Sequence, residues 1–142
     1  MKDKDRIDKI VKALEPELKE LSHKIHENPE LGLEEYKACA WQVELIKKHG
    51  FEVEENYCGM PTAYRAVYKG KKPGPKIAFM SEYDALPEIG HACGHNLIGT
   101  SGAGAGVILK EIMEKYGIGG TLKVLGTPAE ENGSGKITML DE

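Results

Sequence analysis

Two short polar segments carry most of the side chains in this sequence that bind metal ions or transfer protons. The first, residues 82–95, offers carboxylate, imidazole and thiol groups on Glu82, Asp84, His91, Cys93 and His95. The second, residues 127–135, contains the adjacent carboxylates Glu130 and Glu131. Thiolate, imidazole and carboxylate together suit zinc or a similar transition metal, and the thiolate argues against magnesium or calcium.

Neither segment is specific when it is taken alone. The Cys93-Gly94-His95 triplet also fits a buried thiol beside a histidine at a helix start, and adjacent glutamates are most often a solvated pair. Gly94 permits the sharp backbone bend that would turn both of its neighbours toward one ion. Because neighbouring side chains point in opposite directions along an extended chain, we expect one glutamate to hold the metal and the other to face its water.

Together the two segments supply three kinds of ligand and a spare carboxylate, and this set supports hydrolysis. A bound metal ion lowers the pKa of a water molecule from ~16 to ~7. A nearby glutamate then accepts the proton, so an amide is cleaved without a covalent intermediate. The competing hypothesis makes Cys93 a nucleophile, with His91 or His95 as its base.

The hydrophobic pattern predicts the helices and strands that position these segments. Apolar residues recur at helical spacing, and runs rich in β-branched and aromatic residues indicate strands. Pro16 predicts a kink or a restart of the first helix near Glu15, and Asn28-Pro29 ends that helix. The sequence predicts helices at about 7–25, 33–49 and 97–116, strands at 62–68, 77–80 and 121–126, and a last helix that begins at 136.

The order strand, helix, strand over residues 77–126 predicts a βαβ unit with two parallel strands. Ligands bind beyond the carboxyl ends of such strands, so we expect both polar segments at one edge of the sheet. The lysine-rich turn at 69–75 predicts a solvated hairpin tip before a buried strand at 77–80. The glycines between 102 and 106 lack the spacing of a phosphate-binding loop, and they indicate close packing of a helix on the sheet.

The composition is that of an ordinary globular protein, and it excludes several kinds of partner. The 142 residues are 40% hydrophobic and 30% charged, and they are enough for one domain. A net charge of -4 with no basic stripe argues against nucleic acid. No apolar run reaches the ~18 residues of a membrane span, and nothing resembles a secretory signal. Cys39, Cys58 and Cys93 form no CxxC pair, which fits a reducing compartment, so we expect a cytoplasmic protein with Cys39 in its core.

Several motifs in matching order make almost the whole chain similar to a known family. Residues 90–96 read Gly-His-Ala-Cys-Gly-His-Asn, with Asp-Ala-Leu-Pro at 84–87 before them and Gly-Thr-Pro-Ala-Glu-Glu at 126–131 after them. Residues 26–32 read His-Glu-Asn-Pro-Glu-Leu-Gly, and Glu34 and Glu35 follow. With these motifs the chain closely resembles the aminoacylase/carboxypeptidase family of metallopeptidases, in the branch with auxin-conjugate, N-acyl-amino-acid and aminobenzoyl-glutamate hydrolases.

The resemblance implies an α/β fold in which residues 1–142 are the N-terminal portion of a mainly parallel-sheet, zinc-peptidase-like catalytic domain. It implies a site for two divalent ions (Zn, Mn or Co), with Cys93, His95 and Glu131 as ligands and Glu130 as the general base. Two further histidine ligands, a dimerisation domain and the rest of the catalytic domain are expected downstream, in a full-length homodimer. The implied substrates are small molecules: N-acyl amino acids, aminobenzoyl-glutamate-like conjugates or dipeptides.

Two positions depart from the family's pattern. Many relatives carry an acid where this chain has Asn96, and they often have Arg-x-Asp or His-x-Asp where it has Met80-Ser81-Glu82. Both variants fit the aminobenzoyl-glutamate and dipeptidase side of the branch better than the auxin-conjugate side. They leave the role of Glu82 open, and the sequence also leaves the roles of Asp84 and His91 open. A non-catalytic hypothesis also stands, in which the 142 residues are a truncated product that binds metal without turnover.

Overall fold

The computed structural model of the protein describes residues 3–131, 133 and 135–140. The helices are α1 (Asp3–Glu27), α2 (Tyr36–Lys48), α3 (His95–Tyr116) and α4 (Gly135–Leu140), and a 3-10 turn lies at Tyr57–Gly59. The strands are β1 (Glu52–Glu55), β2 (Tyr64–Lys69), β3 (Lys76–Ser81) and β4 (Thr121–Gly126). Every predicted helix and strand is present, whereas β1 and the 3-10 turn were not predicted.

The four strands form one sheet in the order β1-β2-β4-β3. β3 and β4 run parallel, with Ile77 opposite Leu122 and Ser81 opposite Gly126. This pair and the α3 helix between its strands confirm the predicted βαβ unit and the α/β class. β2 runs antiparallel to both β1 and β4, so the sheet is mixed within the described residues rather than mainly parallel.

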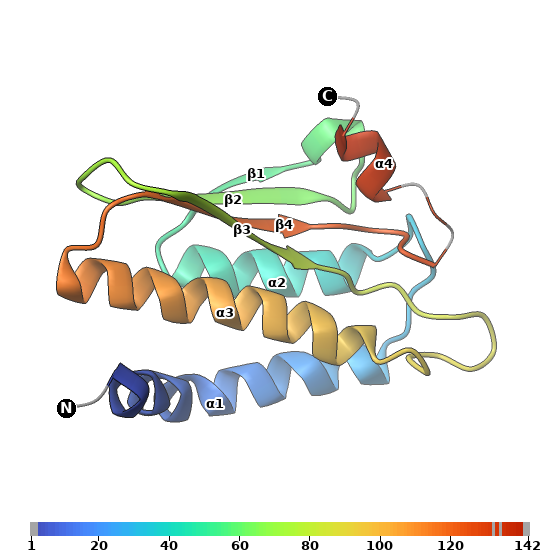
Figure 1. The fold of residues 1–142 in the computed structure, drawn as a ribbon. Helices are drawn as coiled ribbons and strands as arrows, with labels where there is room; N and C mark the ends of the chain where they lie inside the picture. Colours follow the sequence, from blue (N-terminus) through green and yellow to red (C-terminus); the bar gives the residue numbers. More distant parts are fainter. Residues whose placement is uncertain (1–2, 132, 134, 141–142) are drawn as a thin grey trace.

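The three long helices cover one face of the sheet. α2 and α3 lie against it, and α1 lies beyond them as a second helical layer (Figure 1). Tyr64 and Ala66 of β2 and Leu122 and Val124 of β4 are fully buried in the core that these helices share. The approach of α3 is close, as predicted, because a Cβ at Gly106 would lie only 2.3 Å from the Val124 Cγ2 atom.

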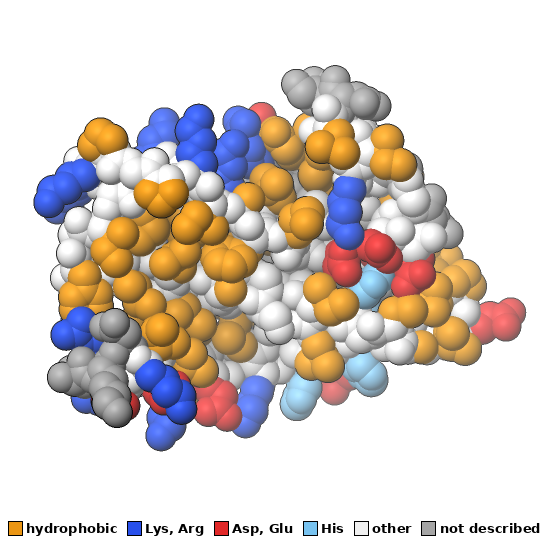
Figure 2. All heavy atoms as spheres, viewed as in Figure 1, with side chains coloured by type: hydrophobic (Ala, Val, Ile, Leu, Met, Phe, Trp, Pro, Cys, Tyr) orange, Lys and Arg blue, Asp and Glu red, His pale blue; other side chains and the backbone are white. Residues whose placement is uncertain are grey.

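Two predictions about β3 are wrong. The turn at 69–75 does not close a hairpin, because β4 lies between β2 and β3. β3 is therefore an edge strand, and it is not buried: Ile77 is 41% and Met80 57% exposed. An apolar run predicts a strand, but long-range pairing decides the place of that strand in the sheet. Figure 2 shows a broad group of hydrophobic side chains on the face where β3 and α3 lie.

The helix boundaries differ from prediction for local reasons. A kink or a restart of the first helix was expected near Pro16. α1 continues through Pro16 as one helix, which excludes the restart. α2 begins at Tyr36 rather than near Leu33, because Leu33 adopts a left-handed φ of 68°. The Glu30 carboxylate then accepts a hydrogen bond from the Ala38 N–H at 2.9 Å and caps the first turn. Among the described residues, no helix combines the length and the apolar character that crossing a membrane requires.

β1 was missed because it is only four residues long and mostly charged. Val53 is the only apolar residue of β1, and the other three residues of the strand are glutamates. Pairing with β2 nevertheless places it at the other edge of the sheet, where Glu54 forms an ion pair with Arg65 at 2.7 Å. Charged edge strands of this kind resist pairing with other molecules. The apolar β3 edge is therefore more prone than β1 to pair with another chain.

We expect the isolated 142-residue polypeptide to be marginally stable and to self-associate through β3. An unpaired apolar strand edge is a template for another chain. Met80→Lys places a charge beside this edge, and it should reduce association without lowering the melting temperature, since Met80 is 57% exposed. Sedimentation velocity over a concentration series measures the association, and circular dichroism on heating measures the stability.

Tyr36→Lys is the matched control for this substitution. Tyr36 is 58% exposed, much like Met80, but it lies at the start of α2 and away from the sheet edge. The control should associate as the unsubstituted polypeptide does. A monodisperse polypeptide with a cooperative melt would contradict the prediction.

Candidate metal centre

Both polar segments begin at the same edge of the sheet, as the parallel pairing predicts. Ser81 ends β3 opposite Gly126, which ends β4. The Thr127 N–H donates a hydrogen bond to the Ser81 carbonyl oxygen at 2.8 Å. The two segments therefore leave the sheet side by side, and their side chains are within reach of one another.

His95 is placed by the start of α3 and oriented by Asp84. Gly94, just before it, has a left-handed φ of 77°, which gives the expected bend. The His95 side chain is buried, and its Nδ1 atom lies 3.0 Å from both the backbone carbonyl oxygen and the Oδ1 atom of Asp84. Because a backbone carbonyl oxygen only accepts hydrogen bonds, Nδ1 carries a proton and donates it. Nε2 is left as the nitrogen available to a ligand.

Three glutamates surround this nitrogen. The His95 Nε2 atom lies 3.6 Å from Glu82 Oε1, 3.7 Å from Glu130 Oε2 and 3.7 Å from Glu131 Oε1. The ligand atoms of Glu82, His95 and Glu130 all lie within 4.8 Å of one another. Figure 2 shows acidic side chains gathered around a histidine where β3 and β4 end. An imidazole nitrogen and converging carboxylate oxygens at more than hydrogen-bond distance fit a divalent cation.

Cys93 lies at the exposed rim of the same cluster. The Glu131 carboxylate beside its thiol raises the pKa of Cys93 above its usual value. Partial desolvation and the charges of Glu130 and Asp84 add to the increase in pKa. A divalent cation would oppose it, since a thiol that coordinates a metal is deprotonated. Of the four side chains singled out in the sequence, His95, Glu130 and Glu131 lie together, and Cys93 lies beside Glu131. The compact group of possible ligand atoms consists of Glu82, His95 and Glu130 and does not include Cys93 or Glu131.

The adjacent glutamates do not lie in an extended segment. They form a turn, and Ala129 before them adopts a left-handed φ of 55°. Both carboxylates consequently approach the His95 Nε2 atom, so the expectation that they point in opposite directions is wrong. Their side chains differ in exposure, at 37% for Glu130 and 26% for Glu131. Only the Glu131 N–H is tied to Asp84, donating to its Oδ2 atom at 3.0 Å.

Three further residues belong to the centre. Glu82 directly follows β3 and joins the cluster, and Asp84 bridges His95 to the turn of the two glutamates. Lys136 of α4 lies 2.5 Å from Glu82 Oε2 and 3.8 Å from Glu130 Oε1, and it brings a positive charge to the carboxylates. The position of Glu82 at the end of a strand was a signal in the sequence. Lys136 gave none, because it stands 54 residues from its partner.

His91 and Asn96 make other contacts. The His91 ring stacks on the ring of His26 with centroids 6.3 Å apart, and burial and then this neighbour lower the pKa of His91. The buried Asn96 side chain donates a hydrogen bond to the Ser22 hydroxyl at 3.1 Å. Asn96 therefore joins α3 to α1.

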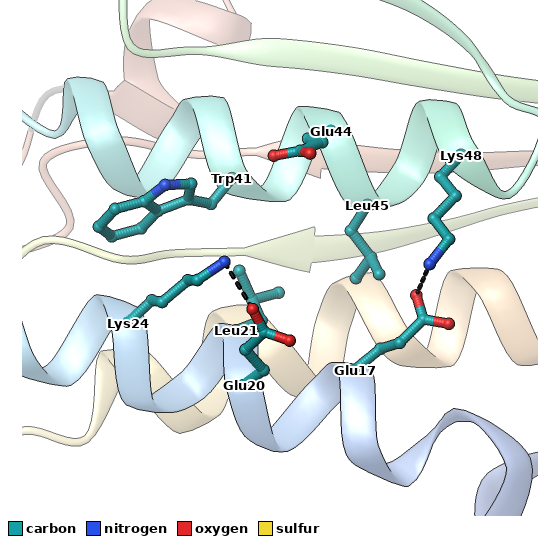
Figure 3. A pocket seen from close by; sticks show the side chains of 8 residues that line it. All are labelled: Glu17, Glu20, Leu21, Lys24, Trp41, Glu44, Leu45 and Lys48. Carbon is teal, nitrogen blue, oxygen red and sulfur yellow. Dashed lines mark hydrogen bonds and ion pairs between the residues drawn. The ribbon is translucent and has the colours of Figure 1, made fainter.

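A surface groove between α1 and α2 is separate from the metal centre. Figure 3 shows the side chains that line it: Glu17, Glu20, Leu21, Lys24, Trp41, Glu44, Leu45 and Lys48. Lys24 pairs with Glu20 at 2.7 Å, and Lys48 pairs with Glu17 at 2.9 Å. These lysines are therefore neutralised within the groove, and none of the cluster residues lines it.

Curated proteins are similar in sequence to this chain, although no protein-family model matches it. It is 40% identical over 152 residues to the Xaa-Arg dipeptidase of Mus musculus. It is 34% identical over 153 residues to one subunit of the p-aminobenzoyl-glutamate hydrolase of Escherichia coli. Each alignment covers 96% of this chain, but only 33% of the dipeptidase and 31% of the hydrolase subunit. The chain therefore spans about a third of the length of these relatives.

A solved structure has the same arrangement of helices and strands. The YXEP protein of Bacillus subtilis, a dinuclear metal binding peptidase from the M20 family, matches with a TM-score of 0.80 and 26% identity. The match covers 92% of this chain and 40% of that chain. Three findings indicate the same family: the motifs at 84–96 and 126–131, the curated relatives and this solved structure. The chain belongs to the aminoacylase/carboxypeptidase family of metallopeptidases, the M20 family.

Proposed function

We propose that the protein is a metal-dependent amidohydrolase or peptidase, and that residues 1–142 are the N-terminal portion of its catalytic domain. The observation that carries the proposal is the convergence of Glu82, Glu130 and Glu131 on the His95 Nε2 atom. The two curated relatives are a dipeptidase and a hydrolase subunit, and the structural neighbour is a metal-binding peptidase. They support the same class of reaction.

Cys93, His95 and Glu131 are the proposed metal ligands. They offer a thiolate, an imidazole nitrogen oriented by Asp84 and a carboxylate, a set that suits Zn²⁺, with Mn²⁺ or Co²⁺ as alternatives. Glu82 lies as near to His95 as Glu131 does, and it is the candidate for contact with a second ion. When bound, a divalent ion polarises the amide carbonyl and makes water more acidic.

Glu130 is the proposed general base. Its carboxylate is the more exposed of the adjacent pair, and its Oε2 atom faces the His95 nitrogen at 3.7 Å. A water molecule beside the cluster is therefore within its reach. Glu130 accepts a proton from the attacking water and gives it to the amide nitrogen as the C–N bond breaks. Asp84 holds the His95 ring throughout.

The proposed substrates are N-acyl amino acids, aminobenzoyl-glutamate-like conjugates or dipeptides. This class follows the names of the relatives from Escherichia coli and Mus musculus. We also propose that the full-length protein is a homodimer, built through a dimerisation domain downstream of this chain. A cytoplasmic location is supported by the three cysteines, all of which are free, with Cys39 in the core as predicted.

The alternative with Cys93 as a nucleophile is less well supported. Such a thiol is activated by an adjacent histidine and has a lowered pKa. The Glu131 carboxylate beside Cys93 instead raises the pKa of its thiol, and the His91 ring stacks on His26. A metal ligand is the role that fits the neighbours of this thiol better.

Removal of metal is expected to abolish the activity of the full-length protein. Exhaustive dialysis against a chelator should end the release of amino acid from N-acyl amino acids or dipeptides, and Zn²⁺, Mn²⁺ or Co²⁺ should restore it. Metal content by mass spectrometry is measured on the same samples. Full activity after chelation, together with inactivation by a thiol-alkylating reagent, would favour the Cys93 nucleophile. The isolated 142 residues should be inactive in either buffer, because the expected downstream histidines are missing from them.

Glutamine substitutions in the full-length protein separate the roles of the two glutamates. Glu130→Gln should retain the metal and lower kcat by about 100-fold or more, because an amide cannot accept the proton. Glu131→Gln should lose metal as well as activity, because a carboxylate ligand is removed. Glu88→Gln is the control: Glu88 is exposed, and it lies in the first polar segment but outside the cluster. Loss of metal from Glu130→Gln, with retention in Glu131→Gln, would reverse the assignment.

A further inference from the structure

A buried glutamate that lies outside both polar segments contacts the turn that carries the proposed ligand and base. The Glu35 side chain is fully buried, and its Oε1 atom accepts a hydrogen bond from the Ala129 N–H at 2.8 Å, across 94 residues of sequence. Ala129 directly precedes Glu130 and Glu131. We propose that Glu35 is a positioning residue, whose carboxylate holds this turn so that both glutamates face His95. The proposal rests on the metal site proposed above.

The side chain of Glu35 does not serve its own helix. Glu35 occupies the N-cap position of α2, but it makes no side-chain capping hydrogen bond. The Glu30 carboxylate has that role, because it accepts hydrogen bonds from the N–H groups of Lys37 at 3.0 Å and Ala38 at 2.9 Å. An N-cap side chain ordinarily bonds to its own first turn. The contact of Glu35 with Ala129 is therefore made for the distant turn and not for α2.

Each partner of this hydrogen bond has an unfavourable feature: Ala129 in its backbone conformation and Glu35 in the burial of its carboxylate. Ala129 has a left-handed φ of 55°, which is disfavoured for a residue with a Cβ atom. Burial raises the pKa of Glu35, and the Ala129 N–H partly offsets that effect. Local strain of this kind persists only where surrounding contacts impose it, and it gathers at functional sites.

Asp84 holds the other side of the same turn. Its Oδ2 atom accepts from the Glu131 N–H at 3.0 Å, while its Oδ1 atom lies 3.0 Å from the His95 Nδ1 atom. Glu35 and Asp84 thus fix the N–H groups on either side of Glu130. Without the Glu35 acceptor, Ala129 can relax to a negative φ and carry the Glu130 carboxylate away from His95. Loss of such an outer partner typically weakens metal binding or activity by about 10- to 100-fold.

Titration of the metal-free full-length protein with Co²⁺, followed by visible absorption, tests this role without turnover. Glu35→Met removes the acceptor at similar volume, and it should weaken Co²⁺ binding by about 10-fold or more. Glu35→Gln keeps an amide oxygen for the Ala129 N–H, and its affinity should stay close to that of the unsubstituted protein. Glu30→Met is the matched control: it removes the capping carboxylate of α2, so it should lower the melting temperature and leave Co²⁺ affinity unchanged.

Unchanged Co²⁺ affinity in Glu35→Met overturns the positioning role, and so does an equal loss in Glu35→Gln and Glu35→Met. Should Glu35→Met fail to fold, Glu35→Asp replaces it, because the shorter side chain withdraws the acceptor from Ala129. Glu35→Asp is expected to weaken Co²⁺ binding, and unchanged affinity there overturns the proposal too. If the unsubstituted protein binds no Co²⁺, the proposed function itself fails, and the role of Glu35 fails with it.

Discussion

The buried carboxylate of Asp84 joins the two polar segments, and the arrangement of the metal centre depends on it. One oxygen lies against the His95 Nδ1 atom, and the other accepts the Glu131 N–H, each at 3.0 Å. A buried carboxylate is costly unless its oxygens are hydrogen-bonded, and both oxygens of Asp84 are used in this way. A shift of either segment therefore breaks a bond to the other. The same contact decides which histidine nitrogen is available and where the two glutamates lie.

The parallel pairing of β3 and β4 and the small residues of α3 place that contact. Ser81 and Gly126 end the two strands at one level, so the segments that follow start together. A Cβ at Gly99 would lie 2.5 Å from the Glu82 carbonyl oxygen, and one at Gly102 would lie 2.2 Å from that of Met80. Larger residues at these positions would push α3, with His95 at its first turn, away from Glu82 and the end of β3. The glycines of α3 thus serve the metal centre as well as the core.

Local sequence patterns predicted the elements better than their order in the sheet. The strand at 121–126 and the helix that ends before Gly117 were predicted closely, because glycines and an apolar run mark their limits. The false hairpin has a different cause, since the turn at 69–75 cannot reveal that β4 pairs with β2. The exposure of β3 follows from the same long-range pairing. The mixed sheet was therefore beyond the reach of local patterns.

At the metal centre, too, local patterns indicated the residues, whereas the contacts that arrange them depend on the fold. Cys93, His95, Glu130 and Glu131 were singled out because their types and neighbours suit a metal, and their roles as ligands and base stay predictions. The turn that brings both glutamates to His95 was not predicted, because it depends on the left-handed φ of Ala129. Glu35 in its contact with Ala129, and Lys136 in its contact with Glu82, act across 94 and 54 residues respectively. No spacing rule covers such distances, so only the fold reveals them.

Anomalous diffraction from crystals of the full-length protein grown with Zn²⁺ tests the central claim most directly. The claim is that Asp84 reserves the His95 Nε2 atom for a divalent cation among the glutamates. The predicted result is a zinc peak at about 2.0–2.1 Å from this nitrogen, with the Nδ1 atom still against Asp84. A peak on the Nδ1 side with Asp84 displaced, or zinc bound only elsewhere, would contradict the account.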